Sequence, residues 1–200
     1  MAINPVLALD QFTRQLFPLA EPGEVFFLRR DGIQFRADVP GPRGKQKMTG
    51  KGAFFLTSNR VVFLREGRVP EGEWTSFDIP LSLMQNPHFR QPIFGANYLD
   101  GHVAPKVTAP NPIAGTAYWS LTFNKGGCGT FLPIFYRILG ETNQPGTQSQ
   151  FIQGAQAGQL SQMAYVDPND PSVLYITQPQ PIPQQAMMGY QGTATAPPPP

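Results

Sequence analysis

The sequence predicts a small, mainly β domain of short antiparallel strands, capped by one helix and followed by a disordered tail. Residues 51–65 carry two apolar runs on either side of a short polar break, the pattern of a β-hairpin. Further short apolar segments between residues 24 and 123 are each bounded by turn residues, which favours a sandwich or small barrel over parallel β-α-β units. From residue 143 onward, Gln, Gly, Ala and Pro dominate, and such a composition cannot bury enough apolar surface to fold.

The first segment of the chain favours a short helix. Asn4 suits the cap of such a helix and Pro5 suits its first position, while Pro18 would end it. The apolar residues between these points share one helical face: Val6, Leu9, Phe12 and Leu16.

Two strands are expected next, at residues 24–29 and 33–37. Asp31 and Gly32 lie between them and are a tight-turn signal. The second segment alternates between apolar and polar residues, as a half-exposed strand does. Residues 40–50 then predict a loop, because they are rich in Gly, Pro and charged residues.

The hairpin at residues 51–65 is the centre of the predicted domain. Neither of its runs alternates between apolar and polar residues, so both faces of its strands should be covered. Asn59 suits the turn because its short side chain tolerates left-handed backbone. A hairpin cannot bury two faces alone, so the rest of residues 1–140 must supply the cover.

Three further segments complete the predicted sheet. Residues 74–84 and 118–123 are expected to be strands. Between them, residues 91–98 and 101–104 predict a second hairpin, which would turn at residues 100–101, an Asp-Gly pair.

The clearest helical signal lies between Thr130, which can cap the start of a helix, and Gly140, which can end it. Burying its apolar stripe offers roughly 7–15 kcal/mol as a gross upper bound. A helix of about ten residues is marginal alone, so this one should dock on the open end of the barrel. Its stripe follows helical spacing: Phe131, Ile134, Phe135, Ile138 and Leu139.

The charges divide the chain at the same place as the composition. All 15 Lys and Arg residues lie at or before Arg137, and 10 Asp and Glu residues accompany them, so the front part carries a net charge of +5. From Glu141 onward there are three acidic residues and no basic ones. We therefore expect a basic domain at residues 1–141 and a weakly acidic tail at residues 142–200.

The residues that could carry chemistry form no catalytic pattern, so we expect no enzyme activity, no metal and no cofactor. His88 and His102 are the only histidines, and neither has metal-ligand spacing to Cys128. Cys128 begins the predicted helix, where a thiol can be reactive. A small residue that fills a tight strand-to-helix turn is the interpretation we favour. A single cysteine and the lack of a signal peptide indicate a reduced, intracellular setting.

The short segment at residues 164–175 is richer in apolar residues than the tail around it. It could be a linear motif that a partner binds through two tyrosines and two prolines, or it could fold back on the barrel. We favour a partner. The motif residues are Tyr165, Pro168, Pro171 and Tyr175.

Four blocks of the sequence resemble the family of WW domain-binding protein 2 and the postacrosomal sheath WW domain-binding protein. Residues 91–98, Gln-Pro-Ile-Phe-Gly-Ala-Asn-Tyr, are the longest and most specific of them. The segment at residues 164–175 also resembles a stretch near the C-terminus of that family. The other three blocks, in matching order and spacing, are residues 51–64, 79–84 and 121–127.

This resemblance implies a GRAM domain, which is a pleckstrin-homology-like barrel of about seven antiparallel strands closed by a C-terminal helix. It also implies a non-enzymatic adaptor, most of all a transcription coactivator that acts in the cytoplasm and nucleus through partners such as transcription factors. The alternative is a phosphoinositide- or membrane-binding GRAM module. Family tails bind WW domains through Pro-Pro-x-Tyr motifs, but residues 143–200 contain none. The tyrosine that the usual mode of WW binding needs after the prolines is therefore absent from this tail.

A cluster of cations before the central hairpin is the candidate lipid contact, because pleckstrin-like barrels often hold phosphoinositides with loop cations. At about 1 kcal/mol per cation near an anionic surface, four cations give roughly 4 kcal/mol, near millimolar affinity. A solvated loop without a ligand is the alternative. Sequence-specific nucleic acid binding is not expected, because the front part is only weakly basic and has no recognition motif. The four cations are Arg43, Lys45, Lys47 and Lys51.

Overall fold

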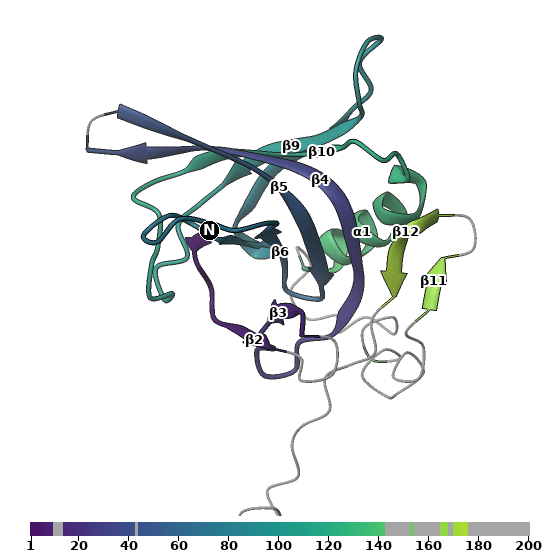
Figure 1. Cartoon of the computed structure of the whole chain (residues 1–200), viewed down its shortest axis with the longest axis horizontal. Helices are drawn as coiled ribbons and strands as arrows, with labels where there is room; N and C mark the ends of the chain where they lie inside the picture. The colour runs from purple at the N-terminus through teal and green to yellow at the C-terminus, as the bar shows by residue number, and fades with distance from the viewer. Residues whose placement is uncertain (10–13, 43, 143–152, 154–164, 168–169, 176–200) are drawn as a thin grey trace, which may run out of the picture.

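An antiparallel sheet curls around one apolar core, and a helix packs against it (Figure 1). This computed structural model describes residues 1–9, 14–42, 44–142, 153, 165–167 and 170–175. In chain order its strands are β1 (Ala2–Ile3), β2 (Leu7–Leu9), β3 (Leu16–Pro18), β4 (Phe26–Gly41), β5 (Gly44–Thr57), β6 (Arg60–Arg65), β7 (Ser76–Pro80), β8 (Met84–Arg90), β9 (Tyr98–Val103), β10 (Ala117–Phe123), β11 (Tyr165–Asp167) and β12 (Asp170–Tyr175), with the 3₁₀ helix η1 (Leu81–Leu83) and the α-helix α1 (Cys128–Thr142).

The strands of the main sheet are ordered β1-β7-β6-β5-β4-β10-β9-β8, and the neighbours whose register is described are all antiparallel. The seven strands from β4 to β10 form the body of the domain, with α1 after them in the chain. The predicted mainly β class is therefore confirmed: an antiparallel sheet followed in the chain by a helix. No helix in the described part of the chain is long and apolar enough to cross a membrane.

The central hairpin is formed by β5 and β6, as predicted. Phe54 lies opposite Phe63 in the ladder, and residues 53–56 are buried, so both faces of the hairpin are covered. The hydroxyl oxygen of Thr57 accepts hydrogen bonds from the backbone N–H groups of Asn59, at 3.1 Å, and Arg60, at 3.0 Å. This side chain closes the turn, and Asn59 is not among the described residues with positive φ. The prediction of a left-handed backbone at Asn59 is therefore wrong.

The predicted turn at residues 31–32 and the predicted loop at residues 40–50 are also wrong, because both lie in one long hairpin. Strand β4 runs through Gly32, with a register shift against β5 between Arg30 and Ile33. Gly32 has a φ of 72°, and a Cβ there would lie 2.6 Å from the side chain of Lys125. The Asp-Gly pair therefore lies at a β-bulge, where the glycine leaves room for the side chain of Lys125. Glycine is favoured at bulges and close contacts as well as in turns.

The second hairpin turns at a different place from the one predicted. Strand β9 continues through Asp100 and Gly101, and residues 91–97, predicted as a strand, form the connection from β8 to β9. Gly101 lies opposite Trp119 on β10, and a Cβ at this glycine would lie 3.3 Å from the indole ring. The glycine therefore gives room to a buried tryptophan and does not mark a turn.

The predicted N-terminal helix is wrong, because residues 7–9 and 16–18 form strands. Strand β1 pairs with β7, and β2 pairs with β3. Asn4 has a φ of 50°, and its side-chain oxygen accepts hydrogen bonds from the backbone N–H groups of Thr75, at 2.7 Å, and Ser76, at 3.2 Å. The residue predicted to cap a helix instead fastens the N-terminal segment to the start of β7. Phe12 of the predicted helix lies outside the described residues.

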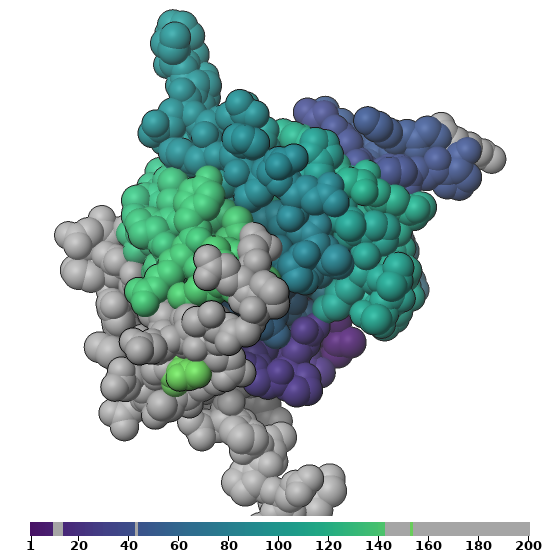
Figure 2. Space-filling view, turned by 180° about the vertical axis from the view of Figure 1, so that it is seen from behind, coloured from purple at the N-terminus to yellow at the C-terminus, as the bar shows by residue number. Residues whose placement is uncertain are grey.

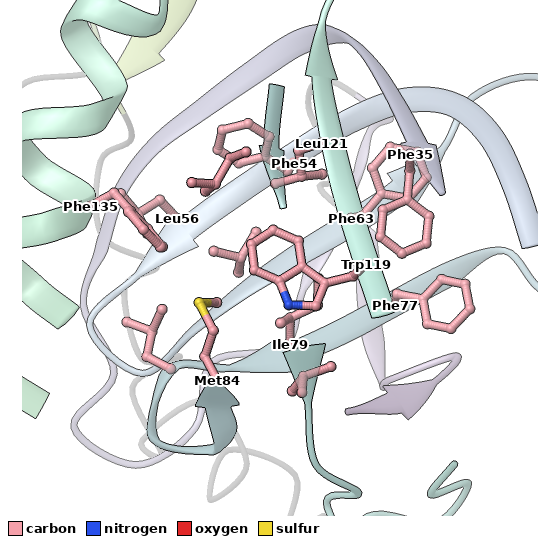
Figure 3. Packing of buried hydrophobic residues seen from close by; sticks show 14 of the residues in the cluster. Phe35, Phe54, Leu56, Phe63, Phe77, Ile79, Met84, Trp119, Leu121 and Phe135 are labelled. Carbon is pink, nitrogen blue, oxygen red and sulfur yellow. The ribbon is translucent and has the colours of Figure 1, made fainter. Parts of the chain in front are cut away.

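Aromatic side chains fill the core between the sheet and α1 (Figure 3). Phe35 of β4 stacks on Phe63 with ring centroids 4.7 Å apart, while Phe131 of α1 packs on Phe54 at 4.9 Å. Phe135 is fully buried and reaches from the helix toward Leu56 (Figure 3). Docking of the predicted helix is confirmed; its stripe residues are buried, except for the half-buried Ile134.

Part of the tail is added to the sheet. Strand β12 pairs with β4, and β11 pairs with β12. Both strands lie within residues 164–175, the segment for which fold-back on the barrel was left open as the alternative to a partner. Apart from them and Gln153, residues 143–200 lie outside the part of the chain that the structure describes.

A network of buried charges joins the start of β6 to β7 and to the segment just before β4. The Arg60 guanidinium donates hydrogen bonds to both carboxylate oxygens of Glu24, from Nε at 2.8 Å and from Nη2 at 2.9 Å. Lys106 forms an ion pair with Asp78 at 2.9 Å and another with Glu21. Arg60, Glu24 and Asp78 are buried, so removing one charge would leave its partners uncompensated.

The pKa of the Glu21 carboxyl lies below its ordinary value of 4.5. Burial is the largest influence and acts to raise this pKa, but the hydrogen bond from Lys106 and the charges of Arg60 and Lys106 outweigh it. A carboxyl with a depressed pKa contributes stability above its unfolded pKa. That contribution is lost as the pH falls through the folded pKa.

We predict that Phe135→Asp unfolds the domain. Truncating a buried Phe costs about 3–5 kcal/mol, and burying an unpaired carboxylate adds to this cost. The sum is comparable to the whole free energy of unfolding of many domains. Thermal melting followed by circular dichroism provides the measurement. Tyr136→Asp is the matched control, because Tyr136 neighbours Phe135 on α1 but is exposed. A Phe135→Asp protein that melts like the parent would contradict docking of α1.

We further predict that Glu21→Gln weakens the dependence of stability on acid pH. The parent should lose stability as the pH falls below about 4.5, and the variant should lose less over the same range. At pH 7 the variant should be less stable by about 0.2–1 kcal/mol, as for other partly exposed ion pairs. Urea unfolding at pH 7 and pH 3 measures both effects. Glu71→Gln, at an exposed position, is the control; equal pH slopes for parent and Glu21→Gln would refute the assignment.

Candidate binding surfaces

The predicted cation cluster lies on a strand and not on a loop. Lys45, Lys47 and Lys51 occupy alternate positions of β5 and are all exposed, so their side chains leave the same face of the strand. Arg43 lies outside the described residues. Figures 1 and 2 show the β4–β5 hairpin as an arm that extends beyond the body of the domain. The first two lysines belong to this arm.

An acidic residue partly neutralises the arm. Asp38 of β4 lies opposite Lys47 and forms an ion pair with Arg36 at 2.6 Å. The hydrogen bond from Arg36 is the main cause of the lowered pKa of the Asp38 carboxyl, and the charges of Lys47 and Lys45 contribute in the same direction. The arm therefore carries one acidic group among its cations, which reduces its attraction for an anionic surface.

Lys51 is separated from the other lysines by the shape of the surface. It lines a groove of about 870 Å³ beside β4, β5 and β6, whereas Lys47 lines a different hollow of about 470 Å³ beside Trp74. The four predicted cations therefore do not form one site. Five cations line the larger groove: Arg14, Arg29, Lys51, Arg65 and Lys125.

Three of these groove cations are free to meet a ligand within the described part of the chain: Arg14, Lys51 and Lys125. Arg29 forms an ion pair with Asp31 at 2.9 Å, and Arg65 forms one with Glu73 at 2.7 Å. Within the described part of the chain, Lys51 and Lys125 have no ion pair or side-chain hydrogen bond, and both are exposed. Sequence reasoning missed Lys125, because nothing in the sequence links the end of β10 to β5.

An apolar tip is the second surface. Ile93 and Phe94 lie in the connection between β8 and β9 and are 94% and 91% exposed. The tip projects from the body on the teal arm visible in Figures 1 and 2. Adjacent large apolar side chains with such exposure are a candidate contact for a partner. The sequence singled out this block only for its family resemblance, because the residues were interpreted as a strand.

The residues considered for catalysis do not come together. His88 lies on β8 and His102 on β9, and His102 packs edge-on against Tyr118. Cys128 is the first residue of α1 and is buried, which favours the interpretation of a small residue in a tight turn. Across the described ranges, no group of three or more His, Cys, Asp or Glu residues is placed to hold a metal ion.

The tail motif is brought together as a pair of strands. Tyr165 of β11 lies opposite Tyr175 of β12 in the ladder. Pro171 belongs to β12, and Pro168 lies outside the described residues. The sequence left partner binding and fold-back open for this segment. In the structure its backbone pairs with β4.

Comparisons with known proteins agree with the resemblance seen in the sequence. No protein-family model matches the chain. WW domain-binding protein 2 of Mus musculus is 34% identical over 133 residues, which are 66% of this chain and 44% of that protein. The same protein of Homo sapiens is 41% identical over 85 residues, 42% of this chain and 31% of that protein. The postacrosomal sheath WW domain-binding protein of Bos taurus is 36% identical over 89 residues, 44% of this chain and 28% of that protein.

Among solved structures, the Vps36 N-terminal PH domain is similar to this chain, with a TM-score of 0.48 and 17% sequence identity, over 70% of this chain and 94% of that one. The chain spans less than half the length of the three curated relatives named above. The resemblance expected from the sequence blocks is confirmed: across 66% of its length this chain is similar to WW domain-binding protein 2.

Proposed function

We propose that this protein is a non-enzymatic adaptor that binds protein partners through the connection between β8 and β9. The observation that carries this proposal is the exposure of Ile93 and Phe94 at the tip of a projecting arm. Large apolar side chains of this kind supply most of the binding energy in protein interfaces when a partner buries them. The relatives are named for binding, which supports the same class of function.

The partners we propose are transcription factors, and the activity is transcriptional coactivation by a protein that acts in the cytoplasm and the nucleus. The resemblance to WW domain-binding protein 2 supports this choice. WW domains are not the partners we propose, because residues 143–200 contain no Pro-Pro-x-Tyr motif. A WW groove needs the tyrosine ring as well as the prolines.

We predict that the double variant Ile93→Ser/Phe94→Ser loses its partners. Because both side chains are almost fully exposed, the change should leave thermal melting unaltered. Loss of two anchoring side chains costs about 2 kcal/mol or more, so recovery of transcription factors from nuclear extract should fall roughly 30-fold. Affinity purification with quantitative mass spectrometry provides the measurement. Val107→Ser is the control, because Val107 is 80% exposed elsewhere on the surface; equal recovery by both variants would overturn the proposal.

A second candidate function is transient contact with anionic membranes, supported by the two unpaired lysines of the larger groove. Lys51 and Lys125 approach it from different parts of the chain. Each cation near an anionic surface contributes about 1 kcal/mol. Lys51 and Lys125 together would therefore contribute about 2 kcal/mol, a weak attachment that would assist an adaptor without anchoring it.

For this second function, Lys51→Glu/Lys125→Glu should sediment with vesicles of anionic phospholipid at least about 30-fold more weakly than the parent. Neutral phosphatidylcholine vesicles should bind neither protein. Lys45→Ala/Lys47→Ala tests the arm separately, and binding equal to the parent would reject the arm as the site. If the groove variant also binds like the parent, membrane contact through the groove is excluded.

A further inference from the structure

One edge of β4 is divided between two different strands. The undivided edge of β4 pairs with β5 along almost the whole length of β4. On the other, β10 pairs only with residues 33–38, and β12 pairs with residues 28–30. The bulge between Arg30 and Ile33 lies between the two ladders. This second edge is therefore complete only when a segment from the tail is present.

Residues 28–30 would otherwise present bare main-chain groups. Successive N–H groups of a strand point to opposite edges, so at least one of these three residues directs its N–H away from β5. An unpaired strand edge is a template for another extended segment. Pairing of this kind rests on main-chain hydrogen bonds and is a common way in which domains bind extended peptides.

The tail can reach this edge within the same molecule. Residues 143–164 separate the end of α1 from the start of β11. At about 3.3 Å per residue, 22 residues span up to roughly 70 Å, which exceeds the width of a domain of this size. A segment tethered in this way has an effective concentration of about millimolar, so even a weak strand pairing is occupied.

We propose that the edge of β4 at residues 28–30 is a strand-docking site whose occupant is the chain's own segment at residues 165–175. Val173, Leu174 and Tyr175 pair with Arg30, Arg29 and Leu28, and β11 folds over as the outer strand. Docking holds Tyr165 and Tyr175 opposite each other in a hairpin. Any partner that binds this segment as an extended peptide must first release it from β4. The docking does not depend on the apolar tip at residues 93–94.

The test removes the main-chain donors of the docked strand in the full-length chain. In Val173→Pro/Leu174→Pro, one of the two lost N–H groups points toward β4 and the other toward β11, because successive groups alternate. Hydrogen exchange followed by mass spectrometry should show amides of residues 28–30 exchanging about tenfold faster or more. Amides in the same stretch that face β5 should keep their protection and serve as an internal reference. Met187→Pro/Met188→Pro makes the same change elsewhere in the tail and should alter neither group.

A second measurement tests the edge as an acceptor. A fluorescent peptide with the sequence of residues 164–176 is added to the parent and to Val173→Pro/Leu174→Pro. The variant should bind it at least about tenfold more strongly, because its edge is open while that of the parent is filled in cis. Unchanged exchange at residues 28–30 in the variant would overturn the proposal, and so would failure of the peptide to bind the variant. Loss of partners in the Ile93/Phe94 variant with normal exchange would leave the docking intact, so the two proposals fail separately.

Discussion

The ladder between β4 and β5 is the contact on which the rest of the structure depends. These strands stand at the middle of the order β1-β7-β6-β5-β4-β10-β9-β8, so each half of the sheet is joined to the other through them. Phe35 on the inner face of β4 packs on Phe63 of β6. Phe54 on the inner face of β5 packs on Phe131 of α1. The helix can dock only because this ladder curves and presents aromatic rings to it. Without the ladder, neither half retains a covered core.

The curled sheet also explains why the candidate functions lie on surfaces and not in a cavity. Its interior is filled by side chains, with Trp119 fully buried at the centre (Figure 3). The end of the β4–β5 hairpin and the connection between β8 and β9 extend beyond this core and leave the body as arms. The β4–β5 arm carries cations and the β8–β9 arm carries apolar residues. The same core thus presents two surfaces of different chemistry.

Local sequence patterns predicted the elements whose stabilising contacts follow from periodicity. The hairpin at residues 51–65 and the helical stripe from Phe131 to Leu139 are of this kind. Patterns failed where one residue type serves several purposes. Gly32 and Gly101 resembled turn residues, but Lys125 and Trp119, both distant in sequence, occupy the space that these glycines leave. Asn4 resembled a helix cap, and its true acceptor role depends on Thr75.

The candidate sites divide in the same way. The alternation of Lys45, Lys47 and Lys51 could have predicted a shared strand face, had residues 40–50 not been interpreted as a loop. The groove, the buried charges around Arg60 and the docking of β12 join residues that are far apart in the chain. No short-range pattern encodes them.

The division of the β4 edge has a consequence for synthesis of the protein on the ribosome. Arg30 and its ladder partner Val173 are 143 residues apart. At 5–20 residues per second, the ribosome therefore needs roughly 7–29 s to add the strand that completes the edge. Only in the last part of that interval, after β10 ends at Phe123, does the nascent chain carry this unpaired edge beside the completed strands β4 to β10. Chaperones that recognise extended backbone would meet the newborn protein at this position, and release from them would coincide with completion of the tail.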